Sequence, residues 1–331
     1  MTNGASMRQW WTVPGDNGAV LELRQVPIPR PGPGEVLVRI MGTGVNRGEL
    51  MSKPAMRRDN PSVRPRPSGI ECAGAIATLG DGVEGFAIDD KVMARGSACH
   101  AEYALLAAPA LMAVPEHLSF AEAAAIPNVF VTAHDAIVSN SRLKSGEKIL
   151  ITAGSSGVGS AAIQIAAYLG ASEIIATSRA AAKGDRLREI GATVVVDTSK
   201  DDWTARIIDL TDGGVDVVID QVGGEMFPGL LNIMAVAGRY VSVGRNAGAR
   251  TTIDLDQLAR DRLQLIGVTF RTRSAAEALA CSESFARDLL PAFSQRRLRP
   301  VLDRAFALDQ LAAAHEYMLS DQQFGKVVLA E

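Results

Sequence analysis

The feature that most constrains the fold is a glycine-rich turn between a buried strand and a helix. The stretch ILITAGSSGVG at 149–159 is an apolar run followed by Gly154, Gly157 and Gly159 and then by a helical pattern. Glycines let the backbone approach a ligand closely, and the free N–H groups and positive dipole end of a helix attract an anion. The spacing is G-x-x-G-x-G rather than G-x-G-x-x-G, so the position of the turn between a strand and a helix is stronger evidence for a binding site than the motif itself. Together they predict a pyrophosphate-binding turn, with a tight turn that binds no ligand as the alternative.

The sequence around this turn alternates between apolar strands and amphipathic helices. Continuous apolar strands separated by helices are typical of a parallel sheet that is covered on both faces. We therefore predict an α/β domain with a doubly wound sheet. The predicted strands are 148–154, 173–178, 193–197, 216–222, 239–244 and 263–270, and the predicted helices between them are 158–169, 180–190, 203–210 and 225–234.

The first hundred residues have a different pattern, with short strand-like runs separated by turns dense in Pro and Gly, such as 27–34. This pattern predicts a small, partly open β-barrel. Ser119 and Glu122 form a predicted capping box that opens a helix, which Pro127 interrupts. The last sixty or so residues contain a predicted helix at 274–290 and a final strand-like run, KVVLA. They are too few for a separate domain, so we expect them to pack on the barrel.

Composition limits the classes of function. The chain has 331 residues, enough for two domains, with 34 basic and 37 acidic residues and a net charge of −3. Only 5% of the residues are aromatic. A mildly acidic chain with few aromatic rings is a poor candidate for nucleic-acid binding.

The cysteines and the apolar runs bear on the cellular compartment. Cys72, Cys99 and Cys281 lie far apart and form no CxxC pair, which fits a reducing compartment. The first residues lack the apolar core of a signal peptide. The longest apolar run, 103–114, is interrupted by Pro109 and is too short to span a bilayer. We expect a cytoplasmic enzyme or ligand-binding protein with no nucleic-acid or membrane partner.

The end of the second strand after the turn predicts which dinucleotide is bound. An NAD-binding site places an Asp or Glu there to hold the ribose 2′-hydroxyl. This strand instead ends in Ser178 and Arg179, and Lys183 follows one helical turn later. A hydroxyl and two cations suit a 2′-phosphate, so we predict NADPH. The alternative is that both cations are merely solvated at a helix start.

With these residues in place, the chain resembles the medium-chain dehydrogenase/reductase superfamily, and most of all its zinc-independent NADPH:quinone oxidoreductases, the zeta-crystallin-like group. The matching motifs include PGPGEVLVRI, GVNRGEL, VEGFAIDDKVMA, AAAIPNVFVTAHDAI, ITAGSSGVG, RLRPVLDRAFALDQLAAAH and FGKVVL. The resemblance implies a GroES-like β-barrel domain at 1–126, a Rossmann domain at 127–267 and a segment at 268–331 that returns to the first domain. It also implies a cleft for the nicotinamide, and a homodimer or homotetramer that extends the Rossmann sheet edge to edge.

The resemblance also assigns roles by position. Residues 155–158 should face the pyrophosphate, Arg179 and Lys183 the 2′-phosphate, and Thr198 the adenosine. Further residues should lie along the nicotinamide half, and Lys326 should approach the cofactor from the C-terminal side. The expected cofactor-binding residues are Gly154, Ser155, Ser156, Gly157, Val158, Gly159, Ser178, Arg179, Lys183, Thr198, Val243, Gly244, Phe270 and Lys326.

Zinc-dependent members of the superfamily carry a Cys, a Gly-His-Glu motif and a further Cys or Asp. The matching positions in this chain are Asn46, Ile70 and Asn128. An isoleucine cannot bind a metal and amides are poor zinc ligands. We therefore expect no metal site, and NADPH as the cofactor without zinc or flavin.

Without a Lewis acid, the acceptors that suit hydride transfer are quinones and α,β-unsaturated carbonyls. A hydrogen-bond donor at the carbonyl oxygen would lower the barrier. We predict that the amide of Asn46 and the hydroxyl of Thr132 are the catalytic donors, with the proton taken from solvent.

The segment 51–67 departs from the family pattern because it has no aromatic residue to stack on a quinone. It is either a solvated loop or a basic rim that attracts an anionic acceptor such as a carboxylate or an acyl-CoA thioester. The leading hypothesis is quinone reduction, the second is reduction of an enone or enoyl double bond, and the third is a non-catalytic NADPH-binding protein. The segment's charged residues are Lys53, Arg57, Arg58, Asp59, Arg64 and Arg66.

Overall fold

The computed structural model describes residues 4–51 and 56–330. The chain divides into two compact units. The first unit comprises Met1–Asn128, Ser282–Ser294 and Pro300–Glu331, and the second comprises Val129–Cys281 and Gln295–Arg299. The predicted boundary after residue 126 therefore lies two residues early, and residues 268–281 lie in the second unit rather than with the returning segment.

The second unit is built on a six-stranded sheet in the order β11-β10-β9-β12-β13-β14, with every neighbouring pair parallel. This is the strand order of a doubly wound dinucleotide-binding fold, which confirms the predicted α/β class. The strands form because runs of Ile and Val are buried on both faces of the sheet. Their bounds are β9 Lys148–Ile151, β10 Glu173–Ser178, β11 Val194–Asp197, β12 Val215–Asp220, β13 Met234–Ser242 and β14 Gln264–Gly267.

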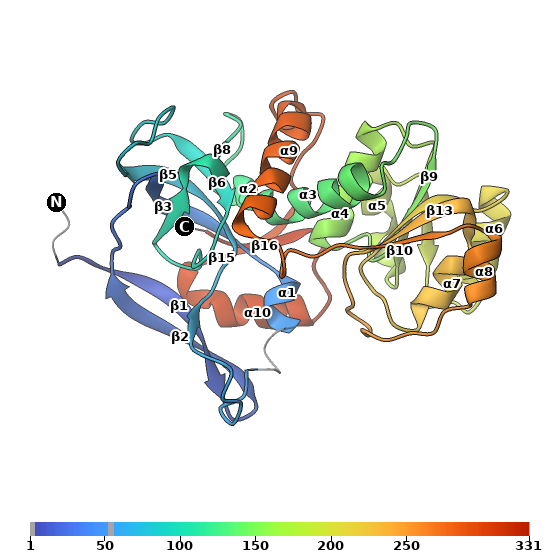
Figure 1. The fold of residues 1–331 in the computed structure, drawn as a ribbon, viewed down its shortest axis with the longest axis horizontal. Helices are drawn as coiled ribbons and strands as arrows, with labels where there is room; N and C mark the ends of the chain where they lie inside the picture. Colours follow the sequence, from blue (N-terminus) through green and yellow to red (C-terminus); the bar gives the residue numbers. More distant parts are fainter. Residues whose placement is uncertain (1–3, 52–55, 331) are drawn as a thin grey trace. The chain divides into compact units, whose positions relative to one another are not determined.

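Helices connect these strands and lie on both faces of the sheet (Figure 1). The predicted helix 180–190 is divided into a 3-10 turn and a short α-helix at Gly184. The predicted helix 225–234 ends two residues early, at Asn232, because β13 already begins at Met234. The helices are α4 Gly157–Tyr168, η4 Ala181–Lys183, α5 Gly184–Glu189, α6 Trp203–Thr211, α7 Met226–Asn232 and α8 Leu255–Arg260.

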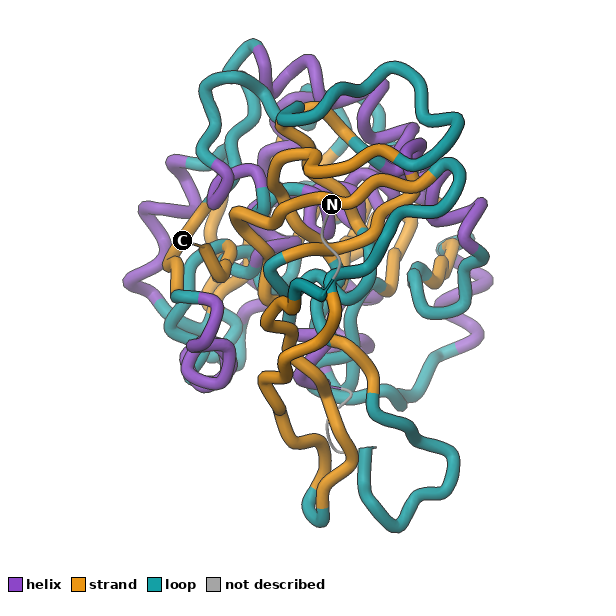
Figure 2. The backbone as a smooth tube through the Cα atoms, turned by 90° about the vertical axis from the view of Figure 1, so that its left-hand side faces the viewer, coloured by secondary structure: helices purple, strands orange, loops and turns teal. Residues whose placement is uncertain are grey.

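The first unit contains a three-stranded sheet, β2-β1-β4, and a seven-stranded sheet, β15-β16-β3-β5-β6-β8, with β7 paired to β3. Figure 2 shows the β1–β2 hairpin reaching away from the other strands of this unit. The strands are β1 Ser6–Gly15, β2 Gly18–Pro27, β3 Glu35–Val45, β4 Arg66–Pro67, β5 Glu71–Leu79, β6 Lys91–Arg95, β7 Tyr103–Ala107, β8 Met112–Ala113, β15 Leu302–Phe306 and β16 Lys326–Ala330.

The C-terminal strand β16 joins the main sheet of the first unit, as expected for the returning segment. It pairs antiparallel with β3, with Val327 opposite Val45. This register brings residues at the start of β16 next to residues at the end of β3, although they are far apart in the sequence. The strand is covered by α10 Leu311–Leu319, and α1 Arg47–Met51 follows β3 directly.

Three further helical segments complete the fold. The predicted capping box is present: Ser119 and Glu122 bond reciprocally at the start of α2 Phe120–Ala123. Next, α3 Pro127–His134 runs from the first unit into the second and continues as the π-helical turn η3 Asp135–Asn140. The longest helix is α9 Ala275–Ser294. Within the described residues, no helix has the length and apolar character that crossing a bilayer requires.

Candidate functional site

The glycine turn joins β9 to α4 in the second unit. Ser156 caps α4, because its Oγ accepts the N–H of Gly159 at 2.9 Å and donates to Oε1 of Gln221 at 2.8 Å. A Cβ on Gly159 would lie 2.4 Å from the carbonyl oxygen of Ala153, and a Cβ on Gly154 would meet a neighbouring side chain at 3.0 Å. Gly159 therefore needs to be glycine in this turn, and at Gly154 a larger residue would require the neighbouring side chains to move.

The first turn of α4 offers backbone donors to an anion. The N–H groups of Gly157 and Val158 have no intrahelical acceptor, because they lie in the first turn, and Ser155 precedes them in the turn itself. Both groups and the helix dipole favour a negative charge at this point. The residues of the turn therefore fit the pyrophosphate of a dinucleotide.

Asp220, at the end of β12, fixes the turn through a hydrogen-bond network that the sequence analysis did not identify. Its buried carboxylate is also next to Tyr240 on β13: burial raises the pKa of the Tyr240 phenol, and the adjacent negative charge raises it further. The only sequence signal for this network was an acidic residue at the carboxyl end of a strand. The carboxylate accepts from Oγ1 of Thr152 at 2.8 Å, the N–H groups of Val222 and Gly223 at 2.9 Å, and the Tyr240 hydroxyl at 2.5 Å.

The residues predicted to contact the 2′-phosphate lie together after β10. Ser178 is the last residue of β10, Arg179 is exposed, and Lys183 ends the 3-10 turn η4. Thr198, after β11, donates its backbone N–H to the carbonyl oxygen of Ser178 at 3.2 Å. The carboxyl end of β10 thus combines a hydroxyl with two cations, and the neighbouring strand β11 ends beside it in Asp197, which is paired in register with Ser178.

The residues predicted for the nicotinamide half lie at the carboxyl ends of the later strands. Val243 and Gly244 follow β13, and their N–H groups donate to the carbonyl oxygen of Asp220 at 2.8 and 3.1 Å. Phe270 follows β14 and is half-buried, with the guanidinium of Arg273 at 4.7 Å from its ring centre. The structure therefore places these predicted residues on the same sheet edge as the glycine turn.

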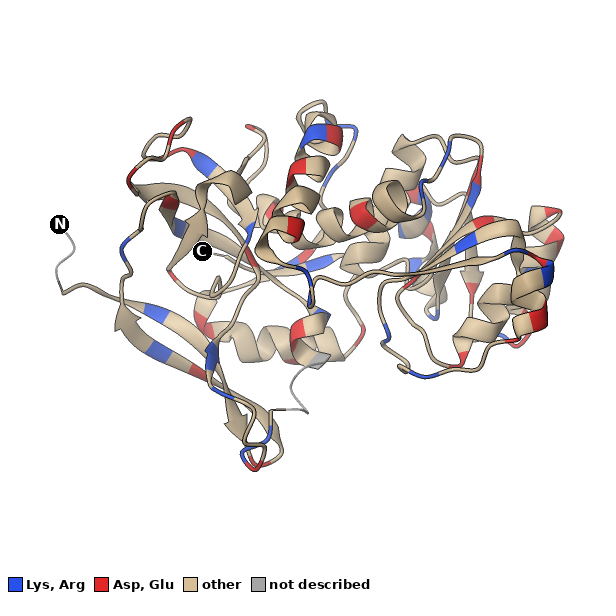
Figure 3. Cartoon of the chain, in the orientation of Figure 1, with Lys and Arg blue, Asp and Glu red and all other residues tan. Residues whose placement is uncertain are grey.

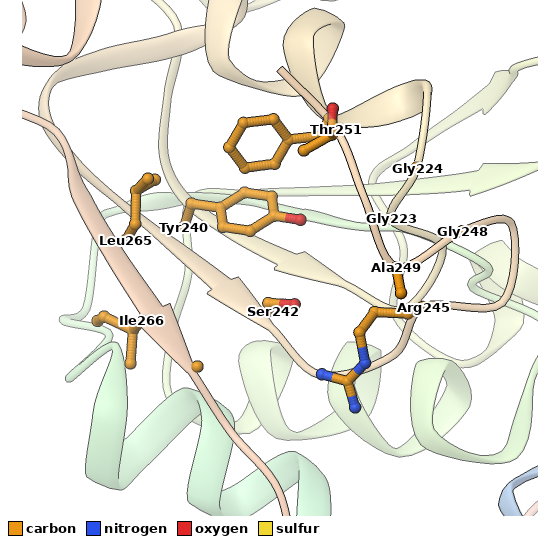
Figure 4. Close-up of a pocket in the computed structure, with 12 residues that line it drawn as sticks. Gly223, Gly224, Tyr240, Ser242, Arg245, Gly248, Ala249, Thr251, Leu265 and Ile266 are labelled. Atoms are coloured by element: carbon orange, nitrogen blue, oxygen red, sulfur yellow. The ribbon is translucent and has the colours of Figure 1, made fainter. Parts of the chain in front are cut away.

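A cavity of about 240 Å³ lies against β13 and the outer strand β14. Figure 4 shows Tyr240, Arg245 and Thr251 around it, with Leu265 on the β14 side. None of the predicted cofactor-binding residues lines this cavity. Its lining residues Ser242 and Arg245 directly flank Val243 and Gly244 in the sequence.

A buried polar cluster in the first unit occupies the positions of the zinc ligands. The ammonium of Lys326 lies 2.6 Å from Oε1 of Glu71 and donates to Oδ1 of Asn46 at 2.7 Å and to the carbonyl oxygen of Val45 at 2.9 Å. Asn46 donates through Nδ2 to Oε1 of Glu71 at 2.9 Å. Asn128 donates its backbone N–H to Oε2 of Glu71 at 2.6 Å and its Nδ2 to Oδ1 of Asn46 at 2.8 Å.

This donor set does not fit zinc. Asn46 and Asn128 offer amides, and Ile70 offers no ligand atom. In the part of the chain that the structure describes, no group of three or more His, Cys, Asp or Glu is arranged to hold a metal ion. The ammonium of Lys326 and the carboxylate of Glu71 form an ion pair, and a second carboxylate, that of Glu49, accepts the backbone N–H of Asn46 at 3.1 Å.

The predicted catalytic donors differ in how much of their hydrogen-bonding capacity is in use. Asn46 is only 7% exposed and its amide is bonded to Lys326, Glu71 and Asn128. Thr132 is half-buried on α3, and no hydrogen bond of its hydroxyl is found among the described residues. Lys326 is 3% exposed and its ammonium is held within the first unit. Roles for all three in catalysis or cofactor binding stay predictions.

The basic segment 51–67 is partly neutralised. Arg57 pairs with Asp59 at 3.0 Å and Arg58 with Asp16 at 3.3 Å, and acidic residues accompany the basic ones at this end of the hairpin (Figure 3). Asp59 and Arg57 shift each other's pKa, downward for the acid and upward for the base. Lys53 lies outside the described residues. The segment therefore has less free positive charge than its sequence suggests.

Comparisons with known proteins agree with this architecture. The family model for alcohol dehydrogenase GroES-like domains matches residues 32–136, and the one for zinc-binding dehydrogenases matches residues 157–284. The chain is 31% identical over 329 residues to the spectinabilin polyketide synthase system protein NorB of Streptomyces orinoci, covering 97% of this chain and 14% of that protein. It therefore spans only a small part of the polyketide synthase relatives that it matches. It is 27% identical to the quinone oxidoreductase-like protein 2 homolog of Nematostella vectensis, covering 90% of this chain and 82% of the relative.

Solved structures give the same result. The mycobacterial protein Rv1454c, solved in complex with NADPH, superimposes with a TM-score of 0.87 at 26% identity and covers 98% of this chain and 100% of its own. The JamJ enoyl reductase superimposes with a TM-score of 0.84 at 26% identity, covering 98% and 99%. With the strand order, the glycine turn and both domain matches, these findings show that the chain belongs to the medium-chain dehydrogenase/reductase superfamily of oxidoreductases, in its quinone oxidoreductase-like group.

Proposed function

We propose that this protein is a zinc-independent, NADPH-dependent reductase of carbon–carbon double bonds conjugated to a carbonyl, such as enones, enals and enoyl thioesters. The observation that carries the proposal is the polar cluster at the zinc positions, where Lys326 and Glu71 neutralise each other and leave no ligand set for a metal. A site without a Lewis acid suits acceptors that can take up a hydride when only a hydrogen bond stabilises the negative charge on the carbonyl oxygen.

The cofactor assignment is supported by the residues of the second unit. NADPH, when bound, supplies the hydride. The N–H groups of Gly157 and Val158 are placed to bind its pyrophosphate, and Ser178, Arg179 and Lys183 its 2′-phosphate. The NADPH complex of Rv1454c supports the same choice for this chain.

The choice of acceptor is supported by the comparisons and by one feature of the sequence. JamJ is an enoyl reductase, and NorB belongs to a polyketide synthase system. The segment 51–67 offers no aromatic ring on which a quinone could stack. Quinone reduction is the second candidate, because the Nematostella relative is named quinone oxidoreductase-like.

Assembly into a homodimer or homotetramer forms part of the proposal. Strand β14 is the outer strand of the six-stranded sheet, and Leu265 on it is 41% exposed. An unpaired strand edge with an exposed apolar side chain is suited to pairing with a second copy.

The test is NADPH oxidation at 340 nm with crotonyl-CoA, 2-hexenal, 1,4-benzoquinone and 9,10-phenanthrenequinone in parallel, each repeated with NADH. We expect turnover of the conjugated alkenes with NADPH and a much lower kcat/KM with NADH. Turnover of the quinones alone would support the second candidate. Tight NADPH binding without turnover of any acceptor would identify a cofactor-binding protein and overturn the proposal.

A further inference from the structure

The cluster of Asn46, Glu71, Asn128 and Lys326 fixes the direction in which its two amides point. A lysine ammonium can only donate hydrogen bonds, so the atom of Asn46 that faces Lys326 at 2.7 Å is its oxygen. The ionised carboxylate of Glu71 can only accept, so the atom of Asn46 at 2.9 Å from it is the nitrogen. The two charged groups thus impose one orientation on the Asn46 amide.

That orientation passes to Asn128. The Oδ1 of Asn46 is an acceptor, so the side-chain atom of Asn128 that lies 2.8 Å from it is the NH₂ group. The backbone N–H of Asn128 is held separately by Oε2 of Glu71 at 2.6 Å, which fixes the residue's position at the start of α3. Two hydrogen bonds therefore hold Asn128 in place, one made directly to Glu71 and the other to Asn46, whose orientation the ion pair fixes.

The two amides differ in the donors that remain. Nδ2 of Asn46 points one hydrogen at Glu71 and is 3.3 Å from the carbonyl oxygen of Gly44, and the residue is almost fully buried. Asn128 is half-buried, and among residues 4–51 and 56–330 its amide group has one hydrogen-bond partner, Asn46. One N–H of Asn128 is therefore available to an acceptor, whereas those of Asn46 are in use.

We propose that Asn128 is the catalytic residue that donates a hydrogen bond to the carbonyl oxygen of the acceptor. Lys326 and Asn46 are positioning residues that keep the NH₂ group of Asn128 turned toward that oxygen. The proposal rests on the proposed function. Hydride adds to the β-carbon, the double-bond electron pair moves to the carbonyl oxygen, and the Asn128 N–H stabilises the resulting enolate. A proton from water then adds at the α-carbon, so that NADPH is oxidised and the alkene is reduced by two electrons.

The ion pair matters because a flipped amide would be unfavourable in the transition state. If both Lys326 and Glu71 lost their charges, the Asn46 amide could rotate by 180°, and Asn128 would then have to turn its Oδ1 toward the growing negative charge. Removing Lys326 alone would leave Glu71 buried without a counter-charge, and such a variant can fail to fold. The neutral pair Glu71→Gln with Lys326→Met avoids this problem because neither charge remains.

The experiment measures kcat, KM for 2-hexenal and the NADPH dissociation constant for five proteins. These are the wild type, Asn128→Asp, Asn128→Ala, the Glu71→Gln/Lys326→Met pair, and Asn128→Ala in the background of that pair. Asn17→Asp, the same chemical change in the exposed hairpin turn, is the matched control. Thermal unfolding of every variant checks that it is folded.

We expect Asn128→Asp to lower kcat by about 10²–10³-fold, the usual effect of losing one oxyanion donor, with the NADPH dissociation constant unchanged within about threefold. The neutral pair should lower kcat by about tenfold or more. The variant that combines the pair with Asn128→Ala should have the same kcat as Asn128→Ala alone, within about threefold, because the residues act as one unit. The Asn17→Asp control should match the wild type.

Three results would overturn the inference. Asn128→Asp with kcat within threefold of the wild type would show that another group holds the oxygen. Multiplicative losses in the combined variant would show that Lys326 does not act through Asn128. A wild-type protein that binds NADPH but reduces none of the four acceptors would overturn the proposed function and this inference together. This third result differs from the first two because the wild type itself is inactive.

Discussion

The polar cluster of the first unit and the glycine turn of the second unit both interact with charged groups, but in opposite ways. In the cluster, the charges of Lys326 and Glu71 neutralise each other inside the protein, and the amides of Asn46 and Asn128 complete the bonding. In the turn, the N–H groups of Gly157 and Val158 have no acceptor within their own helix. The ion pair of the cluster is therefore formed within the protein, with one N–H of Asn128 left available to an acceptor, whereas the turn is completed by an anion.

This difference predicts that changes in the two regions will affect different quantities. A buried ion pair that loses one partner leaves an uncompensated charge, which lowers stability. A backbone anion site contributes little to stability in the absence of its ligand, so changes around it should mainly affect binding.

The largest effect should come from Glu71→Ala. The change leaves the Lys326 ammonium buried without a counter-charge, and the backbone N–H of Asn128 loses its acceptor. We expect the free energy of unfolding to fall by about 3–5 kcal/mol, measured by urea denaturation. Glu116→Ala, at an exposed glutamate, is the control and should change it by less than about 0.5 kcal/mol. An equally small change for Glu71→Ala would mean that the cluster is not the closed ion-pair site described above.

The next effect should appear in binding rather than stability. Arg179→Ala combined with Lys183→Ala removes two cations beside Ser178. Because each charge-assisted hydrogen bond contributes about 1.5–3 kcal/mol, the NADPH dissociation constant should rise by about 10²-fold or more, with little effect on NADH or on the unfolding midpoint. Isothermal titration calorimetry with both cofactors measures this. Equal losses for NADPH and NADH would refute the 2′-phosphate assignment, and Arg287→Ala on α9 provides the matched control.

The glycine turn could be predicted from the sequence because its geometry is local. A strand, a turn with three glycines and a helix occupy one continuous stretch, and the close contact of Gly159 with Ala153 follows from that geometry. The parallel, doubly wound sheet was predictable from the alternation of strands and helices along the chain. What the sequence did not reveal was Asp220, since its partners Thr152 and Tyr240 come from different strands.

The polar cluster was less predictable because its members come from four distant segments. The family pattern identified the positions of Asn46 and Asn128, but Lys326 was expected to approach the cofactor. The structure shows its ammonium bonded to Glu71 and Asn46, because β16 pairs with β3 in a register that aligns Val327 with Val45, and its approach to the cofactor stays a prediction. Strand register between the two ends of a chain is a tertiary property that local sequence patterns do not specify.

A smaller effect should come from Tyr240→Phe, which tests the network beneath the turn. Asp220 would keep its bonds to Thr152 and to two backbone N–H groups but would lose the Tyr240 hydroxyl. We expect a loss of about 1–3 kcal/mol in the free energy of unfolding at pH 7. Because the pKa of Tyr240 is raised in the folded state, its contribution is present below about pH 10, where an unfolded tyrosine begins to ionise, and is lost as the pH rises further. The difference between the two proteins should therefore shrink above pH 10. A difference that grows there would contradict the assigned direction of the shift.

The smallest expected effect is that of metal removal, and it sharpens the contrast between the two regions. Asn46, Ile70 and Asn128 provide no thiolate, imidazole or carboxylate at the zinc positions, and Lys326 places a positive charge beside them that would repel a cation. Dialysis against EDTA should therefore leave kcat/KM for 2-hexenal within about 20% of its starting value. Added zinc should not raise it, and mass spectrometry should find less than about 0.1 zinc per chain, far below the one-to-one content of a catalytic site. If the protein contained stoichiometric zinc, and the zinc and the activity were lost together, the protein would bind the metal through ligands other than those of the cluster. The contrast between the ion-pair cluster and the anion-binding turn would then no longer hold.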